Sequence, residues 1–429
     1  MAEPSITWIQ GATVVDSEGS READVLFCDG KVRAVGAVGA MGDVPEGAAV
    51  VDGRGRILMP GLFDMNAHLR EPGREDKEDM ATGSAAAVQG GVTGLLAMPN
   101  TDPPVDSAGM VQSVTDLAAA KSPIPIFPAG CLTKSRAGAE MAAIGEMACL
   151  GVKLLTDDPS PVEDAQLLRR LMEYARGFDL IVASHATTPA LVRGGSVNEG
   201  EVGYFLGLGG MPSMAEEIAI FRDVAIARHT GCRLHIQHVS SARGLEVIRR
   251  AKEEGIPVTC EATPLHLIFD DSAVCGYDTR FKMDPPLRAV EDREALLEGL
   301  RDGTVDVIAS NHAPHSVFEK NTDFASAPFG ASLFDTLLPA LHHHVLAEGG
   351  LSLEILVEKF CLAPRRLLGL PEPGFREEAA VDAVLFNPAD GTEVSQTFLK
   401  SRGCNNPFLG QTLQGRVEGV WLGEKRLLG

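Results

Sequence analysis

Residues 234–262 read LHIQHVSSARGLEVIRRAKEEGIPVTCEA, and this stretch decides the fold. It begins and ends with short apolar runs typical of buried strands, LHIQHVS and IPVTCEA, and a helical stretch separates them. Strands that alternate with helices run parallel in one sheet. The same alternation continues through GLLAMPN, PIPIFPAG, GVKLL, LIVASHA and DVIASNHAPH. This many units predicts an α/β fold with a (β/α)8 barrel of the TIM type.

The two ends of the chain have a different texture. Residues 1–55 contain short β-type runs separated by Gly, Asp and Ser turns, and residues 375–429 return to this pattern. We therefore expect the barrel to occupy residues 56–374. We expect the segments 1–55 and 375–429 to build one small β domain beside it.

One helix between barrel strands has a readable start. Ser213 and Glu216 form a capping-box pattern, which predicts that a helix begins there. An apolar stripe at Ile218, Phe221 and Ala225 is expected to form its buried face.

Composition excludes several classes of protein. The 429 residues include 59 acidic and 38 basic ones, and the net charge of −21 argues against a nucleic-acid partner. No run of about 18 uncharged apolar residues predicts a membrane span. The amino terminus, MAEPSITWIQ, lacks the pattern of a secretory signal, so we expect a cytoplasmic protein. The eight cysteines are scattered without a C-x-x-C pair, which favours reduced thiols over disulfides or a cysteine zinc site.

Polar side chains recur where the apolar runs end. In parallel barrels the chemistry gathers at the carboxyl ends of the strands, so these residues are expected to lie together. Histidine and carboxylate ligands without cysteine suit Zn²⁺ or a similar divalent ion. The candidates are His68, Asp157, Asp158, His185, His238, Asn311, His312 and His315.

The stretch DMNAHLR at residues 64–70 departs from the pattern that such a site needs. A D-x-H-x-H-x-R string would place two imidazoles on one face of a strand. Asn66 stands at the first of these positions and offers no imidazole nitrogen. Lys153 in GVKLL would bridge two metals if it were carbamylated, but we favour a strand residue whose amine reaches solvent. Asp158 precedes Pro159 and would also serve as a turn residue.

Longer motifs carry a resemblance to a known family. They include PGLFDMNAHLREPG, GLLAMPNTDPPVD, LTDDPSPV, SHATTPALVRGGSVNEG, FKMDPPLR, DVIASNHAPH and APFG, and the tail SRGCNNPFLGQTLQGRV. In this order, from about residue 50 to the carboxyl terminus, the chain resembles the dihydroorotases of the amidohydrolase superfamily, in their longer bacterial type. Hydantoinases and allantoinases share the scaffold.

The resemblance implies a metal-dependent barrel that reversibly closes carbamoyl-aspartate to dihydroorotate with up to two zinc ions. By resemblance, Asn66 and His68 occupy the first histidine pair and Asp158 the bridging carboxylate. His185 and His238 correspond to the ligands of the second metal. Asn311 stands where the family has an aspartate that is both metal ligand and proton shuttle. The positions that bind the substrate correspond to Arg70, Asn100 and His315.

The departures from the family pattern affect both metal binding and proton transfer. Asn66 and Asn311 would take two ligands from the first metal, whereas the second set keeps three, so we expect zinc at a single site or none. An amide cannot carry the proton, and losing a general base costs about 10²–10⁴-fold in rate. Asp284 and Leu265 stand where the family usually shows Asn and His, and Asp284 adds a negative charge near a site meant for a dianion.

Three functions remain open. The leading hypothesis is a non-catalytic protein of pyrimidine biosynthesis that assembles with aspartate carbamoyltransferase as an oligomer. The alternative is an active mononuclear zinc amidohydrolase that acts on dihydroorotate or a related cyclic ureide. The third is a sensor that binds carbamoyl-aspartate or dihydroorotate through Arg70, Asn100 and His315 without chemistry.

Overall fold

The computed structural model describes residues 6–429, so the first five residues of the amino-terminal stretch MAEPSITWIQ lie outside it. Within this range no helix is both long enough and apolar enough to cross a membrane.

Eight parallel strands form the barrel that the sequence predicts. Strands β6, β7 and β8 pair in order, as do β9, β10, β13, β14 and β15. The bridge between Gly130 and Leu155 joins the two groups, and the bridge between Ala67 and His312 closes the barrel. The strands are β6 (Leu62–Ala67), β7 (Val92–Ala97), β8 (Ile126–Pro128), β9 (Leu154–Leu155), β10 (Ile181–Ser184), β13 (Arg233–Ile236), β14 (Val258–Ala262) and β15 (Val307–Ile308).

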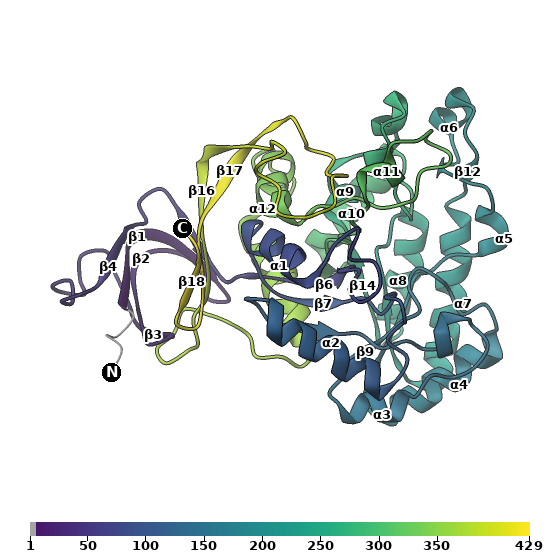
Figure 1. Cartoon of the computed structure of the whole chain (residues 1–429), viewed down its shortest axis with the longest axis horizontal. Helices are drawn as coiled ribbons and strands as arrows, with labels where there is room; N and C mark the ends of the chain where they lie inside the picture. The colour runs from purple at the N-terminus through teal and green to yellow at the C-terminus, as the bar shows by residue number, and fades with distance from the viewer. Residues whose placement is uncertain (1–5) are drawn as a thin grey trace.

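Helices surround these strands on the outside (Figure 1). The longer ones are α1 (Met80–Gln89), α2 (Ala108–Lys121), α4 (Ala165–Arg176), α7 (Met214–Thr230), α8 (Ala242–Glu253) and α10 (Val290–Asp302). The shorter ones are α3 (Ile144–Cys149), α5 (Pro189–Val192), α6 (Glu201–Leu206), α9 (Pro264–Ile268), α11 (Val317–Lys320), α12 (Leu337–Leu341), α13 (Leu353–Val357) and α14 (Ala363–Leu367). π-Helical turns at His342–Leu346 and Glu358–Leu362 continue α12 and α13, and 3₁₀ turns lie at Lys134–Arg136, Asp271–Gly276, Thr279–Phe281 and Phe334–Thr336. A two-stranded ribbon, β11 (Val197–Asn198) and β12 (Gly210–Met211), flanks α6.

Helix α7 starts where the sequence predicts, but both details of that prediction are wrong. The Ser213 side chain makes no capping bond. The Glu216 carboxylate turns inward and accepts hydrogen bonds from the backbone N–H groups of Ser240 (3.2 Å) and Ser241 (2.9 Å). The stripe at Ile218, Phe221 and Ala225 faces solvent. The apolar residues of the buried face are Ala215, Ala219, Ile220, Val224 and Ala227.

The reason is the close packing of α8 against α7. A Cβ atom at Gly244 of α8 would lie 2.8 Å from Cδ1 of Ile220, so the two helices meet at a position without a side chain. The glycine leaves room for Ile220, which points inward, while Ile218 and Phe221 lie on the outer face.

Both chain ends build the small β domain beside the barrel (Figure 1). The sheet runs in the order β18-β17-β16-β5-β1-β2-β3, with β4 paired to β1. It extends to Met59, past residue 55, because β5 pairs with both β1 and β16. Its strands are β1 (Ile6–Asp16), β2 (Gly19–Cys28), β3 (Lys31–Gly36), β4 (Ala49–Asp52), β5 (Ile57–Met59), β16 (Asp382–Glu393), β17 (Thr412–Leu422) and β18 (Lys425–Leu428).

A buried ion pair fastens this domain to the barrel. Nη2 of Arg365, in α14, lies 2.6 Å from Oδ2 of Asp382, the first residue of β16. The guanidinium also donates to the carbonyl of Gly61 (2.9 Å) and to Oγ1 of Thr93 (3.0 Å). Arg365 is 4% exposed, so its charge is satisfied almost entirely by protein groups.

Candidate functional site

A cavity of about 310 Å³ opens at the carboxyl ends of the barrel strands. It brings together most of the candidate residues from the sequence, although they come from five different strand ends. Its lining consists of His68, Arg70, Asn100, Asp158, Pro159, His185, Asp284, Asn311, Ala313, His315, Pro328, Phe329 and Gly330.

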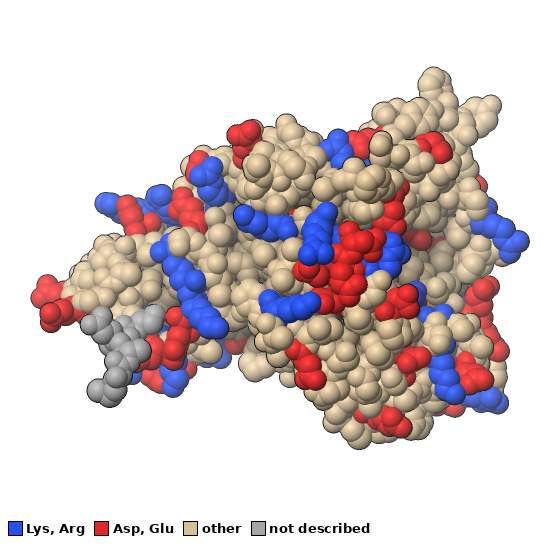
Figure 2. Space-filling model, in the orientation of Figure 1, with Lys and Arg blue, Asp and Glu red and all other residues tan. Residues whose placement is uncertain are grey.

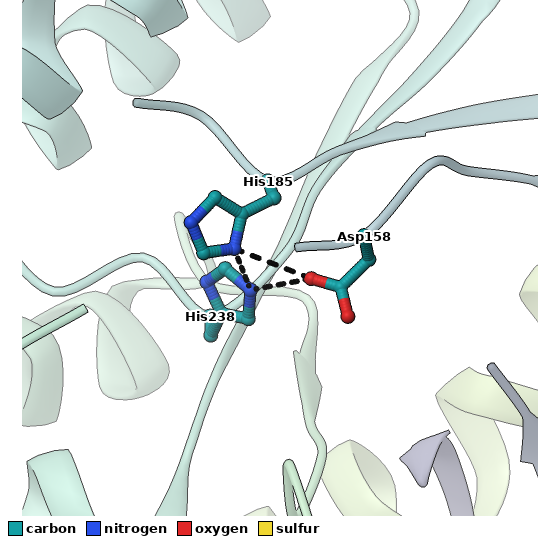
Figure 3. Close-up of side chains that lie close together, drawn as sticks. All are labelled: Asp158, His185 and His238. Carbon is teal, nitrogen blue, oxygen red and sulfur yellow. Dashed lines mark hydrogen bonds and ion pairs between the residues drawn. The ribbon is translucent and has the colours of Figure 1, made fainter. Parts of the chain in front are cut away.

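Three buried side chains at the base of this region could hold a metal ion (Figure 3). Nδ1 of His185 lies 3.0 Å from Nε2 of His238 and 3.2 Å from Oδ1 of Asp158. The third edge, from Nε2 of His238 to Oδ1 of Asp158, is 3.3 Å. Ligands about 2.1 Å from a tetrahedral ion stand roughly 3.4 Å apart, so the triangle matches one face of such a site.

The electrostatics of this triangle suit a cation. Burial alone would raise the pKa of Asp158, but hydrogen bonds from His185 and His238 outweigh it and hold that pKa well below its usual range. Burial would lower the pKa of His185, but the charges of Asp284 and Asp158 raise it above its ordinary value. Within residues 6–429, Oδ2 of Asp158 has no hydrogen-bond partner, and it points to His68 with Nε2 at 3.4 Å. These residues therefore fit one divalent ion.

The residues around His68 offer few metal donors. The Asn66 amide is buried and donates from Nδ2 to Oε1 of Glu261 at 2.8 Å. The Oδ1 of Asn311 lies 3.3 Å from Nε2 of His68. Burial and the charge of Arg70 lower the pKa of His68 to about 4, so its imidazole is neutral. His68 remains the single nitrogen donor among these residues, too few for tight zinc binding.

Glu261 is a site residue that the sequence reasoning missed. It lies in β14, one residue before the end of the strand, and is almost fully buried. Its Oε2 lies 3.1 Å from Nε2 of His235, and its Oε1 accepts the backbone N–H of His238 at 3.2 Å. The signal was the carboxylate in IPVTCEA, at the same strand end as the other candidates.

The residues expected to bind the substrate line the cavity, but several of their polar atoms already contact other protein groups. Nε of Arg70 donates to the carbonyl of Pro314 at 3.2 Å, and its terminal nitrogens line the cavity without a hydrogen-bond partner in the described chain. Burial lowers the pKa of Arg70 to about 10, so it stays charged at neutral pH. Asn100 places Oδ1 2.9 Å from Nδ1 of His68.

His315 lines the cavity, but protein groups occupy both of its ring nitrogens. Nε2 lies 2.8 Å from the carbonyl of Phe329, and Nδ1 lies 3.4 Å from Nζ of Lys77. Burial and the charge of Arg70 lower the pKa of His315 to about 3, so the ring is neutral. Asn405 from the carboxyl-terminal segment accepts the backbone N–H of His315 at 3.0 Å and so fixes this wall of the cavity.

Other candidates have structural roles. Lys153 is exposed and lines a different cavity beside Asp179, so it does not reach the metal candidates. Asp157 accepts the backbone N–H groups of Leu132 (2.8 Å) and Thr133 (3.1 Å) and holds a loop. His312 stacks on Phe334 with the ring centroids 4.0 Å apart.

Comparison with known proteins identifies the scaffold. A family model described as dihydro-orotase-like matches residues 55–244. The dihydroorotase of Carboxydothermus hydrogenoformans is 41% identical over 91% of this chain and 93% of its own length. That of Caldanaerobacter subterraneus subsp. tengcongensis is 39% identical over 96% of this chain and 94% of its own length. The L-hydantoinase (dihydropyrimidinase) of Arthrobacter aurescens shares the fold, with a TM-score of 0.85 and 24% identity over 98% of this chain and 96% of that one. The chain belongs to the dihydroorotase family.

Proposed function

We propose that this chain is a dihydroorotase homologue with an impaired metal and proton site, and that it serves as a non-catalytic partner of aspartate carbamoyltransferase. The observation that supports the impairment is the pair of amides around His68. Asn311 stands 3.3 Å from its Nε2, and Asn66 is committed to Glu261. Neither amide can accept a proton at neutral pH, and neither is a strong zinc ligand.

The remaining residues keep part of the original chemistry. Asp158, His185 and His238 would hold one divalent ion, which supplies a Lewis acid when bound. Arg70 and Asn100 would bind the carboxylate of carbamoyl-aspartate or dihydroorotate. A carboxylate that accepts and returns a proton is missing at Asn311, so binding is retained and turnover is lost.

A second candidate function rests on the intact triangle. If one ion suffices, the chain is a mononuclear amidohydrolase that acts on dihydroorotate or a related cyclic ureide. Its three ligand atoms lie 3.0–3.3 Å apart, close to what one tetrahedral ion requires.

Metal content and turnover measured on the same sample separate these functions. Protein purified without chelator is expected to contain at most about one zinc per chain and to hydrolyse no dihydroorotate above background. His238→Ala should remove whatever metal is bound, because two ligands remain, whereas His229→Ala, at an exposed position near the end of α7, should leave the metal content unchanged. Turnover above background that disappears in His238→Ala would reject the non-catalytic function in favour of the mononuclear enzyme.

One end of the molecule offers an apolar contact for the proposed partner. Tyr204 and Phe205 of α6 are each 89% exposed, and Phe318 of α11 is 91% exposed. Figure 2 shows that the projection around α6, at the upper right, is mostly uncharged, whereas acidic and basic side chains are mixed over the centre of this face. Aromatic residues are enriched in protein interfaces and costly to leave in water, which supports placing the contact here.

The proposed partnership predicts a complex that depends on the exposed aromatic residues of α6. The chain and aspartate carbamoyltransferase from the same organism, expressed together, should co-migrate on size exclusion. Replacing Tyr204 and Phe205 by Ser should weaken the complex at least about tenfold, because central aromatic contacts carry most of the binding energy. Val50→Ser, an exposed apolar change on β4 in the other domain, is the control and should not weaken it. Separate migration of the two wild-type proteins would refute the partnership.

A further inference from the structure

Asp284 faces the cavity as a carboxylate that accepts no hydrogen bond from the described part of the chain. It follows the 3₁₀ turn at Thr279–Phe281 and lines the cavity together with Arg70. Its side chain is 28% exposed, and its nearest charged contact is Nε2 of His185 at 3.7 Å, too long for a hydrogen bond. No residue in the described chain donates a hydrogen bond to its oxygens. This carboxylate is therefore available to a ligand.

The other ionic groups of the cavity are largely engaged. Asp158 faces His185 and His238, and the ring nitrogens of His315 face Phe329 and Lys77. Arg70 differs, because its two terminal nitrogens have no partner within residues 6–429. The cavity thus presents one free positive group and one free negative group.

We propose that Asp284 makes the cavity selective for ligands that carry one carboxylate, which Arg70 binds, and a nitrogen-borne hydrogen that Asp284 accepts. Ligands with two carboxylates bind more weakly, because the negative charge of Asp284 repels the second carboxylate. The inference rests on the proposed function in one respect only, that this cavity binds the ligand.

Two probes related by ring opening differ in the number of carboxylates. Dihydroorotate carries one carboxylate and ring N–H groups. Carbamoyl-aspartate, its ring-opened form, carries a second carboxylate. Like charges about 4 Å apart in a partly buried site repel strongly enough to change an affinity about tenfold or more. The ratio of the two dissociation constants also reflects ring opening, so it is the change of this ratio on substitution that reports the charge of residue 284.

The experiment is calorimetric titration of both probes into the wild-type chain and into Asp284→Asn, with the metal content of each sample measured. The wild type should bind dihydroorotate at least about tenfold more tightly than carbamoyl-aspartate. Asp284→Asn keeps an oxygen acceptor but loses the charge, so it should tighten carbamoyl-aspartate about tenfold and change dihydroorotate little. Asp116→Asn on the exposed face of α2, an equal loss of charge outside the cavity, should leave the ratio unchanged.

Two results would overturn the proposal. The first is a ratio that is the same in the wild type and in Asp284→Asn, and the second is the absence of binding by either probe. The partnership with aspartate carbamoyltransferase is read separately by co-migration, so a failure of this proposal is distinguishable from a failure of the proposed function.

Discussion

A chain that carries both Asn66→His and Asn311→Asp is expected to hydrolyse dihydroorotate about 10²–10⁴-fold faster than the parent chain. The two changes return a nitrogen ligand and a carboxylate to the side of the cavity where His68 stands between amides. The carboxylate at residue 311 supplies the missing proton acceptor, 3.3 Å from His68 in the present arrangement of the side chains. Initial rates, measured with the zinc content of each variant, test the expectation.

The single variants are the controls for this restoration. Asn66→His alone should raise the zinc content without a comparable rise in rate, because the proton acceptor is still absent. It must also release the hydrogen bond to Glu261, which remains held by His235 and the backbone of His238. If the double variant binds two zinc ions and stays inactive, the loss of function extends to Asp284 or Leu265.

Replacing Arg365 by Leu should lower the free energy of unfolding by about 3–5 kcal/mol. The change leaves the largely buried Asp382 carboxylate, which links the β domain to the barrel, without its cation, and it also removes the bonds from Arg365 to Gly61 and Thr93 within the barrel. Urea denaturation followed by circular dichroism measures the difference. The urea concentration at the midpoint of unfolding should fall, although no residue of the cavity has been replaced.

Two further variants are the controls for the Arg365→Leu measurement. Removing both charges, with Arg365→Leu and Asp382→Asn together, should cost less than Arg365→Leu alone, because no unpaired charge remains. Lys134→Leu breaks an ion pair with Glu140 on the surface and should leave the midpoint unchanged. An equal, small effect of Arg365→Leu and Lys134→Leu would contradict a structural role for the buried pair.

The barrel could be predicted from sequence because its signal is local. Runs such as LIVASHA and IPVTCEA are apolar on both faces, end in polar residues, and correspond to β10 and β14. The buried face of α7 could not be predicted, because apolar residues occur on both sides of that helix. The contact of Ile220 with Gly244, which accommodates this side chain on the buried face, joins two different helices, α7 and α8.

The candidate site could likewise be predicted only in part from the sequence. His185 and His238 stand out because each directly follows an apolar run. The Asn66 amide donates a hydrogen bond to Glu261, a residue 195 positions away, so this contact could not be predicted from DMNAHLR. The engagement of His315 by Phe329 and Lys77 likewise depends on segments that meet only in the folded chain.

The mixed sheet of the small domain has a consequence during translation. Strand β5 ends at residue 59, whereas its partner β16 begins at residue 382. At roughly 5–20 residues per second, the ribosome needs about 15–65 s to deliver that partner. During this interval the backbone edge of β5 is open to pairing with other nascent chains. Arg365 lies 17 residues before Asp382, so both partners of the ion pair are synthesised together at the end of this interval.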